Sequence, residues 1–234
     1  MSSDTPFETF LLISPKKFSI LVINKSNLQK IYQEEIQSFN VSNQINLDEL
    51  DIFLDDNILK IEKILKNFVK NVYLIIDFNN FFSVRISIKK NNFGNELSSN
   101  SLSYILNEAK DLCSKTLDKK KIVHFIIENY VIDEKHFSKL PKNLKCKILS
   151  LDLKFICLST EVSKSFEHTL KRYQISLKRT FSFDYIKEFI DKNDANIYNL
   201  SKTIIQESFE NEVLIVNKNT RKQGFFEKFF NFFS

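Results

Sequence analysis

The sequence predicts an α/β fold, in which short strands and amphipathic helices alternate along the chain. Apolar runs at residues 10–13, 18–23 and 72–76 have the length of buried strands. Residues 101–117 instead carry apolar side chains at helical spacing, with Leu, Ile and Ala on one face. Residues 224–234 form a further amphipathic segment, so the fold is expected to end in an amphipathic helix.

The first third of the chain predicts three strands, a helix and a fourth, central strand. The turn Ser14-Pro15-Lys16-Lys17 separates two apolar runs and indicates a hairpin. Asp55 and Asp56 are interpreted as the start of the helix, where the helix dipole favours acidic residues. The expected strands are residues 10–13, 18–23, 28–36 and 72–76, and the expected helix is 55–69.

The rest of the chain predicts a half-buried strand, a helix, two long strands and then mostly helices. Val84, Ile86 and Ile88 alternate with polar residues, which is typical of a strand with one face in solvent. Asp133-Glu134 is interpreted as a turn at a strand end. The expected strands are 82–88, 122–132, 146–158, 175–181 and 213–216, and the expected helices are 101–117, 161–173, 182–190 and 197–209.

Composition limits the classes of function. The chain has 234 residues, 43% of them hydrophobic, a net charge of +5, only two glycines and 24 phenylalanines. The excess of Lys, Asn, Ile and Phe is typical of AT-rich coding, so the net charge is weak evidence for nucleic-acid binding. Cys113, Cys146 and Cys157 lack metal-ligand spacing and are interpreted as buried apolar residues in a reducing compartment. No apolar run approaches the roughly 18 residues of a membrane-spanning helix.

No pattern for catalysis or metal binding emerges. His124 is interpreted as a hydrogen-bonded residue within a sheet, and no Cys or second His stands at metal-ligand spacing to it. The basic clusters 119–121, 171–172 and 178–179 raise a nucleic-acid alternative, since aromatic residues stand nearby. Because those aromatics are expected to fill a core, we predict no catalytic residue, no cofactor or metal site and no nucleic-acid partner.

The segment 224–234 carries the clearest functional pattern. On a helix its phenylalanines fall within one arc of about 160°, and polar residues take the opposite face. Such a face next to basic residues suits an anionic membrane surface, although a helix packed on protein is the alternative. The predicted membrane-binding residues are Phe225, Phe226, Phe229, Phe230, Phe232, Phe233, Arg221, Lys222 and Lys228.

Several segments resemble the N-terminal part of FtsA, the actin-like bacterial division protein that tethers the division ring to the membrane. Residues 121–133 (KIVHFIIENYVID) resemble the family's "VLHVIPQEYAID" segment, which is the most specific match. Residues 13–22 stand where the family has its first phosphate hairpin. Residues 147–158 and 171–177 resemble the strand that closes the family's inserted subdomain and the turn that follows.

The resemblance implies a partial actin-like (ribonuclease-H-like) subdomain, split between residues 8–82 and 159–190. Between the halves it implies a strand–helix–strand–strand insert at 83–158, which in the family contacts other proteins. A C-terminal segment and linker at 191–223 would lead to the amphipathic membrane-targeting helix at 224–234.

The sequence departs from the family where FtsA holds ATP. Leu12 stands at the acidic position of the first hairpin, and Ser14-Pro15 replaces a Gly-Thr pair. Pro15 also lacks an N–H donor. Gly94 and Gly224 lie far from any phosphate hairpin, and the second hairpin and adenosine loop are absent. We therefore predict a pseudo-ATPase that is not an enzyme.

The resulting hypothesis is a non-catalytic, FtsA-like division adaptor, located in the cytoplasm and peripheral on the inner membrane. Its expected partners are anionic lipid and division proteins, which contact the insert; self-association stays open. Direct FtsZ binding is not carried over, because the FtsZ-binding subdomain of FtsA has no counterpart. The alternatives are a soluble protein-interaction module and one half of a two-chain ATP-binding complex.

Overall fold

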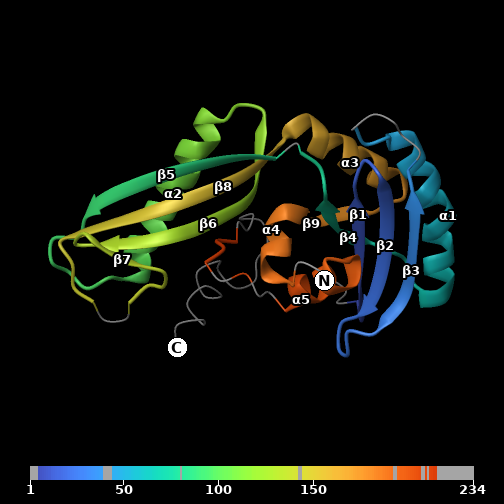
Figure 1. Ribbon diagram of the computed structural model, residues 1–234, viewed down its shortest axis with the longest axis horizontal. Coiled ribbons are helices and arrows are strands. Elements are labelled where there is room, and N and C mark those ends of the chain that lie inside the picture. The colour runs from blue at the N-terminus through green and yellow to red at the C-terminus, as the bar shows by residue number, and fades with distance from the viewer. Residues whose placement is uncertain are drawn as a thin grey trace. The chain divides into compact units, whose positions relative to one another are not determined.

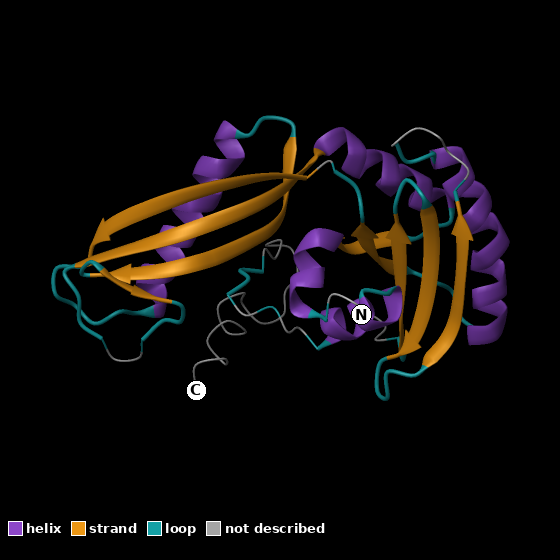
Figure 2. Ribbon diagram, in the orientation of Figure 1, coloured by secondary structure: helices purple, strands orange, loops and turns teal. Residues whose placement is uncertain are grey.

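The computed structural model describes residues 5–38, 44–79, 81–141, 144–191, 194–206, 209 and 211–214. The chain forms two compact units, each with its own sheet and helices (Figures 1 and 2). Unit 1 comprises residues 1–81 and 161–209, and unit 2 comprises residues 82–160 and 210–234. The predicted α/β fold is confirmed, and the predicted C-terminal segment 191–223 is divided between the two units.

Unit 1 is built on a five-stranded mixed sheet with the strand order β3-β2-β1-β4-β9. The first three strands are antiparallel, while β4 pairs in parallel with both β1 and β9. This order and these directions are those of an actin-like, ribonuclease-H-like subdomain. The strands are β1 (Phe7–Ile13), β2 (Lys17–Asn24), β3 (Lys30–Gln37), β4 (Asn71–Ile76) and β9 (Ser176–Ser182).

The helices of unit 1 bury apolar side chains against this sheet. Phe53 packs on Phe18 of β2, with ring centroids 6.2 Å apart. Phe209 stacks on Tyr185 and lies 5.8 Å from the Phe181 ring of β9. The helices are α1 (Leu47–Leu65), α3 (Thr160–Arg172), α4 (Phe183–Ile186), the 3₁₀ turn η1 (Lys187–Phe189) and α5 (Ile197–Ile205).

Helix α1 begins eight residues before the predicted start at residue 55. Its N-cap is Asn46, whose side chain accepts hydrogen bonds from the N–H groups of Asp48 and Glu49. Asp55 and Asp56 are therefore mid-helix residues, and their interpretation as an N-terminus was wrong. The predicted helix 182–190 was also too long, since regular helix there is limited to α4 and η1.

Unit 2 contains a four-stranded sheet in the order β5-β8-β6-β7, with α2 packed against one face (Figure 1). The predicted strand–helix–strand–strand series is confirmed, with β7 as an added strand. Asp133 and Glu134 form the β6–β7 turn at φ 45° and 69°, which confirms the predicted turn. The elements are β5 (Phe81–Asn91), α2 (Ser99–Thr116), β6 (Lys120–Ile132), β7 (Lys135–Phe137) and β8 (Ile148–Ser159).

The core of unit 2 lies between α2 and the sheet. Phe125 of β6 and Phe155 of β8 stack with ring centroids 4.4 Å apart. Cys113, Cys146 and Cys157 are buried free thiols, as the sequence predicted. All three join this apolar cluster, so packing accounts for them.

Candidate functional site

The carboxyl ends of three parallel strands meet at one edge of the unit 1 sheet. Ser14 follows β1, Asp77 follows β4 and Asp184 lies just beyond β9. The N–H group of Asp77 donates to the carbonyl of Ile13 at 2.8 Å, so the ends of β1 and β4 are tied together. Because ligands of open α/β sheets bind at such an edge, this edge is the candidate ligand site of unit 1.

The β1–β2 turn is closed on itself by hydrogen bonds. Ser14 Oγ accepts from the N–H groups of Lys16 and Lys17, at 3.3 and 3.0 Å. The N–H of Ser14 donates to the carbonyl of Lys17 at 2.9 Å, and Pro15 has no N–H. A phosphate cradle needs backbone N–H groups that point at the ligand. Each N–H group of this turn is either bonded within it or missing.

Charged side chains at the same edge are arranged in ion pairs. Lys17 Nζ lies 3.1 Å from Glu35, and Lys187 Nζ lies 2.5 Å from Asp184. Partial burial, followed by the charge of Asp184, raises the pKa of Asp77 from its ordinary value, and Lys187 and Lys17 oppose this shift. The edge thus holds a half-buried carboxyl among paired charges.

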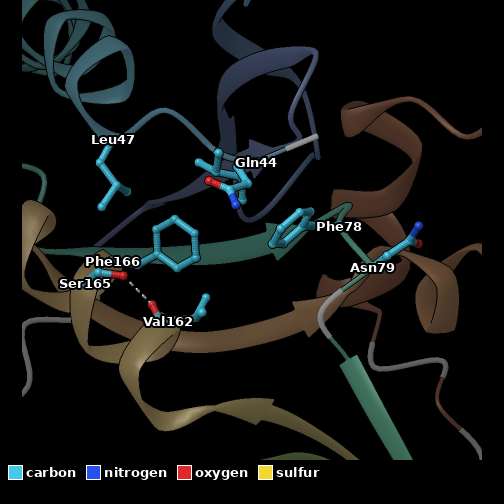
Figure 3. Close-up of a pocket in the computed structure, with 8 residues that line it drawn as sticks. Gln44, Leu47, Phe78, Asn79, Val162, Ser165 and Phe166 are labelled. Atoms are coloured by element: carbon cyan, nitrogen blue, oxygen red, sulfur yellow. Dashed lines mark hydrogen bonds between the residues drawn. The ribbon is translucent and has the colours of Figure 1, made fainter. Parts of the chain in front are cut away.

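A pocket of about 410 Å³ opens next to this edge, within unit 1 (Figure 3). Phe78 comes from the segment after β4, Phe166 and Val162 come from α3, and Leu47 comes from the start of α1. In Figure 3 the Phe78 and Phe166 rings both border the pocket, and the Gln44 side chain lies close to Phe78. This lining can accept an apolar side chain of a partner, but it offers no titratable group for catalysis.

The face of the unit 2 sheet opposite α2 is polar. Arg85 Nε donates to both carboxylate oxygens of Glu128, at 2.9 and 3.0 Å. The hydroxyl of Ser87 and the amide of Asn129 both donate to Asp152, at 2.5 and 3.3 Å. Arg85, Ser87 and Asp152 alternate with core residues along β5 and β8, so the pleat places them on one surface. Such a surface can take part in polar protein–protein contacts.

His124 is a satisfied sheet residue, as the sequence predicted. Its Nδ1 lies 2.7 Å from Glu212 Oε1, and both side chains are almost completely buried. Sequence reasoning missed Glu212, because 88 residues separate it from His124. Among the described residues, no group of three or more His, Cys, Asp or Glu side chains is placed to hold a metal ion.

The aromatics beside two of the basic clusters are engaged in the fold. The Tyr173 hydroxyl lies 2.9 Å from carboxylate oxygens of both Asp51 and Asp55 on α1. Phe181 is fully buried, with the Arg179 guanidinium 4.5 Å from its ring centroid. The prediction that these aromatics fill the core is thus confirmed for Phe181, whereas Tyr173 is half-buried and is held by its bonds to α1.

All of the predicted membrane-binding residues lie outside the described residues. They are Phe225, Phe226, Phe229, Phe230, Phe232, Phe233, Arg221, Lys222 and Lys228. Within the described part of the chain, no helix has both the length and the apolar character that crossing a membrane requires.

No protein-family model matches the sequence, and no curated protein matches it. Among solved structures, the chain is similar to one from a "PilM-PilN type IV pilus biogenesis complex", with a TM-score of 0.50 and 7% identity over 78% of this chain. The chain has an actin-like fold. This conclusion rests on that likeness and on the strand order of unit 1.

Two further solved structures match less closely. The cytoplasmic domain of EpsL, an inner-membrane component of the type II secretion system of Vibrio cholerae, has a TM-score of 0.37, with 11% identity over 77% of this chain. A Bacteroides thetaiotaomicron protein with an actin-like ATPase fold has a TM-score of 0.35, with 12% identity over 80% of this chain. The chain spans 49% of the matched chain of the pilus complex, 58% of EpsL and 57% of the Bacteroides protein. The relation to FtsA in particular stays a prediction.

Proposed function

We propose that this protein is a non-catalytic, actin-like adaptor that acts by binding other proteins at the cytoplasmic face of a membrane. In the more specific form of this proposal it is an FtsA-like division adaptor. Residues 83–158 contact division proteins, and the amphipathic segment 224–234 holds the protein on anionic lipid.

The closed β1–β2 turn is the observation that carries the non-catalytic part of the proposal. An actin-like ATPase needs free N–H donors there, whereas this turn bonds its donors to Ser14 Oγ and the Lys17 carbonyl. Lys17 and Lys187, two of the cations at the same edge, pair with Glu35 and Asp184. An incoming triphosphate would have to replace all of these bonds.

Calorimetric titration of the full chain with MgATP tests this part. We expect no heat of binding up to millimolar nucleotide, and no phosphate release over hours. Saturable binding with a micromolar Kd would contradict the proposal. It would favour the alternative in which this chain is half of an ATP-binding complex.

The membrane part of the proposal rests on the amphipathic pattern of residues 224–234. Phe229→Asp places a charge on the apolar face, and Asn231→Asp places the same charge on the polar face, which makes a matched control. Burial of one phenylalanine contributes about 1.5–3 kcal/mol, so Phe229→Asp is expected to weaken membrane binding at least about tenfold. Fractionation of cells that express each variant measures this. Equal release of both variants, or of neither, would contradict the anchor.

The polar sheet face of unit 2 is the proposed partner surface. A photo-crosslinking residue at Lys89, which lies on the Arg85–Ser87 face of β5, is expected to capture division proteins. The same residue at Lys60 on the exposed side of α1 is the control. The likeness to the chain of the pilus complex favours a second candidate, an adaptor of a pilus-type assembly. Capture of pilus or secretion components at position 89 would support that candidate over the division role.

A further inference from the structure

The chain returns to unit 2 just before the amphipathic segment. The N–H of Val213 donates to the carbonyl of Phe125 at 2.7 Å, and the N–H of Ile127 donates to the carbonyl of Asn211 at 2.9 Å. Glu212 contributes the buried pair with His124. Residues 211–213 are thus fixed on β6, and the segment that follows starts from unit 2.

A strongly basic loop lies next to this starting point. The Asn211 side chain donates to the carbonyl of Ser138 at 3.2 Å, which places it beside residues 135–147. These residues comprise β7 and its connection to β8, and they carry five lysines and no Asp or Glu. Lys135, Lys139, Lys145 and Lys147 are exposed, and Lys142 lies outside the described residues.

The charge of the chain is concentrated in the same unit. Residues 82–160 contain 14 Lys and Arg against eight Asp and Glu. By contrast, residues 1–81 and 161–209 together contain 16 Lys and Arg against 18 Asp and Glu. An anionic surface therefore attracts unit 2 and slightly repels unit 1.

The length of the linker limits how far the amphipathic segment can lie from the residues attached to β6. Nine residues, 215–223, separate Leu214 from Gly224. Even fully extended, they span at most about 32 Å. A membrane that holds residues 224–234 therefore lies within that distance of the point where the chain leaves β6.

We propose that the exposed lysines of residues 135–141 and 144–147, here named the basic loop, form the second half of a two-part attachment to an anionic bilayer. This inference rests on the proposed membrane role of residues 224–234, which supply the apolar half. One short apolar anchor binds a bilayer reversibly, and a polybasic patch beside it gives the second signal that stable attachment needs. The pairing of residues 211–213 with β6 tethers the apolar half to the unit that carries the basic loop.

The same loop fits lipid better than nucleic acid. Its aromatic residue Phe137 and its leucines Leu140 and Leu144 pack against the apolar core of unit 2. Apart from the imidazole of His136, the loop thus presents lysines without an exposed ring on which a base could stack. Point charges on flexible stems suit lipid phosphates, whose positions are not fixed.

Vesicle co-sedimentation of the full chain tests the inference with a loop variant, Lys135→Gln/Lys139→Gln/Lys145→Gln. Each lysine near an anionic surface strengthens binding about fivefold, so the variant is expected to bind phosphatidylglycerol vesicles about a hundredfold more weakly than wild type. Binding to neutral phosphatidylcholine vesicles is expected to stay at the wild-type level. Undiminished binding of the loop variant to the anionic vesicles would overturn the inference.

The matched control removes three exposed lysines of unit 1, Lys60→Gln/Lys63→Gln/Lys164→Gln, and changes the net charge equally. It is expected to bind anionic vesicles nearly as wild type does. An equal loss in both triple variants would overturn the inference, because net charge alone would then explain binding. A loop variant that keeps vesicle binding but loses binding of a single-stranded RNA would also overturn it.

Truncation at residue 223 separates this inference from the proposed function on which it rests. If the truncated chain binds anionic vesicles as well as wild type does, the anchoring role of residues 224–234 is wrong. If truncation abolishes binding while the loop variant matches the unit 1 control, only the role of the basic loop is wrong.

Discussion

Replacement of Glu212 by alanine tests how firmly the chain is attached to β6 ahead of the amphipathic segment. Glu212→Ala removes the carboxylate that lies 2.7 Å from His124 Nδ1, where both side chains are shielded from water. Loss of one partner of a buried hydrogen bond costs about 1–3 kcal/mol, because the other partner stays buried without its bond. We expect the loss to fall on the attachment of residues 211–213, which also includes the backbone bonds to Phe125 and Ile127, the bond from Asn211 to the Ser138 carbonyl and the burial of Val213.

Hydrogen exchange of single amides measures this loss directly. In Glu212→Ala the Val213 and Ile127 amides are expected to exchange at least about fivefold faster, while Leu11 in β1 keeps its protection. Glu212→Gln is the matched control, because its amide can still hydrogen-bond to His124. The Val213 and Ile127 amides of this variant are expected to lose less of their protection from exchange. Unchanged exchange at Val213 in a folded Glu212→Ala protein would refute the reasoning.

Three further predictions concern single side chains. Burial and then Asp184 raise the pKa of Asp77, so its contribution to stability is present at acid pH and is lost as the pH rises through the raised pKa. Asp77→Asn is therefore expected to raise Tm at pH 7 and to leave it unchanged at pH 3; a lower Tm at pH 7 would contradict this. Burial raises the pKa of Cys157 to about 12, so its thiol should resist a disulfide reagent at pH 8 until urea unfolds the chain. Tyr173→Phe removes the hydroxyl that donates to the carboxylates of Asp51 and Asp55. This change should lower the free energy of unfolding by about 1.5–3 kcal/mol in urea titrations.

The spacing of apolar residues was sufficient to predict most elements of the fold. The apolar runs around Leu11, Leu21 and Leu74 became the three central strands, because each is long enough to cross a sheet and too short for a helix. The start of α1 was missed because Asp55 and Asp56 were interpreted as its first turn, although Phe53 and Leu54 continue the helical spacing of buried apolar residues ahead of them. Asn46 supplied a cap signal there that the spacing argument did not use.

Long-range pairing accounts for what the sequence could not predict. Strand β7, with the sequence Lys-His-Phe, has no apolar pattern and exists because the Asp133–Glu134 turn folds it back on β6. The partner of His124 comes from Glu212, and no local signal joins residues so far apart. By contrast, the closure of the β1–β2 turn has a local signal in Ser14-Pro15. The serine hydroxyl can accept hydrogen bonds from N–H groups of its own turn.

Co-sedimentation of the purified full chain with liposomes, with and without residues 224–234, tests the central claim most directly. We predict that the full chain binds liposomes, that binding strengthens with anionic lipid, and that truncation removes it. Failure of the full chain to bind either anionic or neutral liposomes would contradict the account. The amphipathic segment would then pack on protein, and the chain would be an interaction module without a membrane anchor.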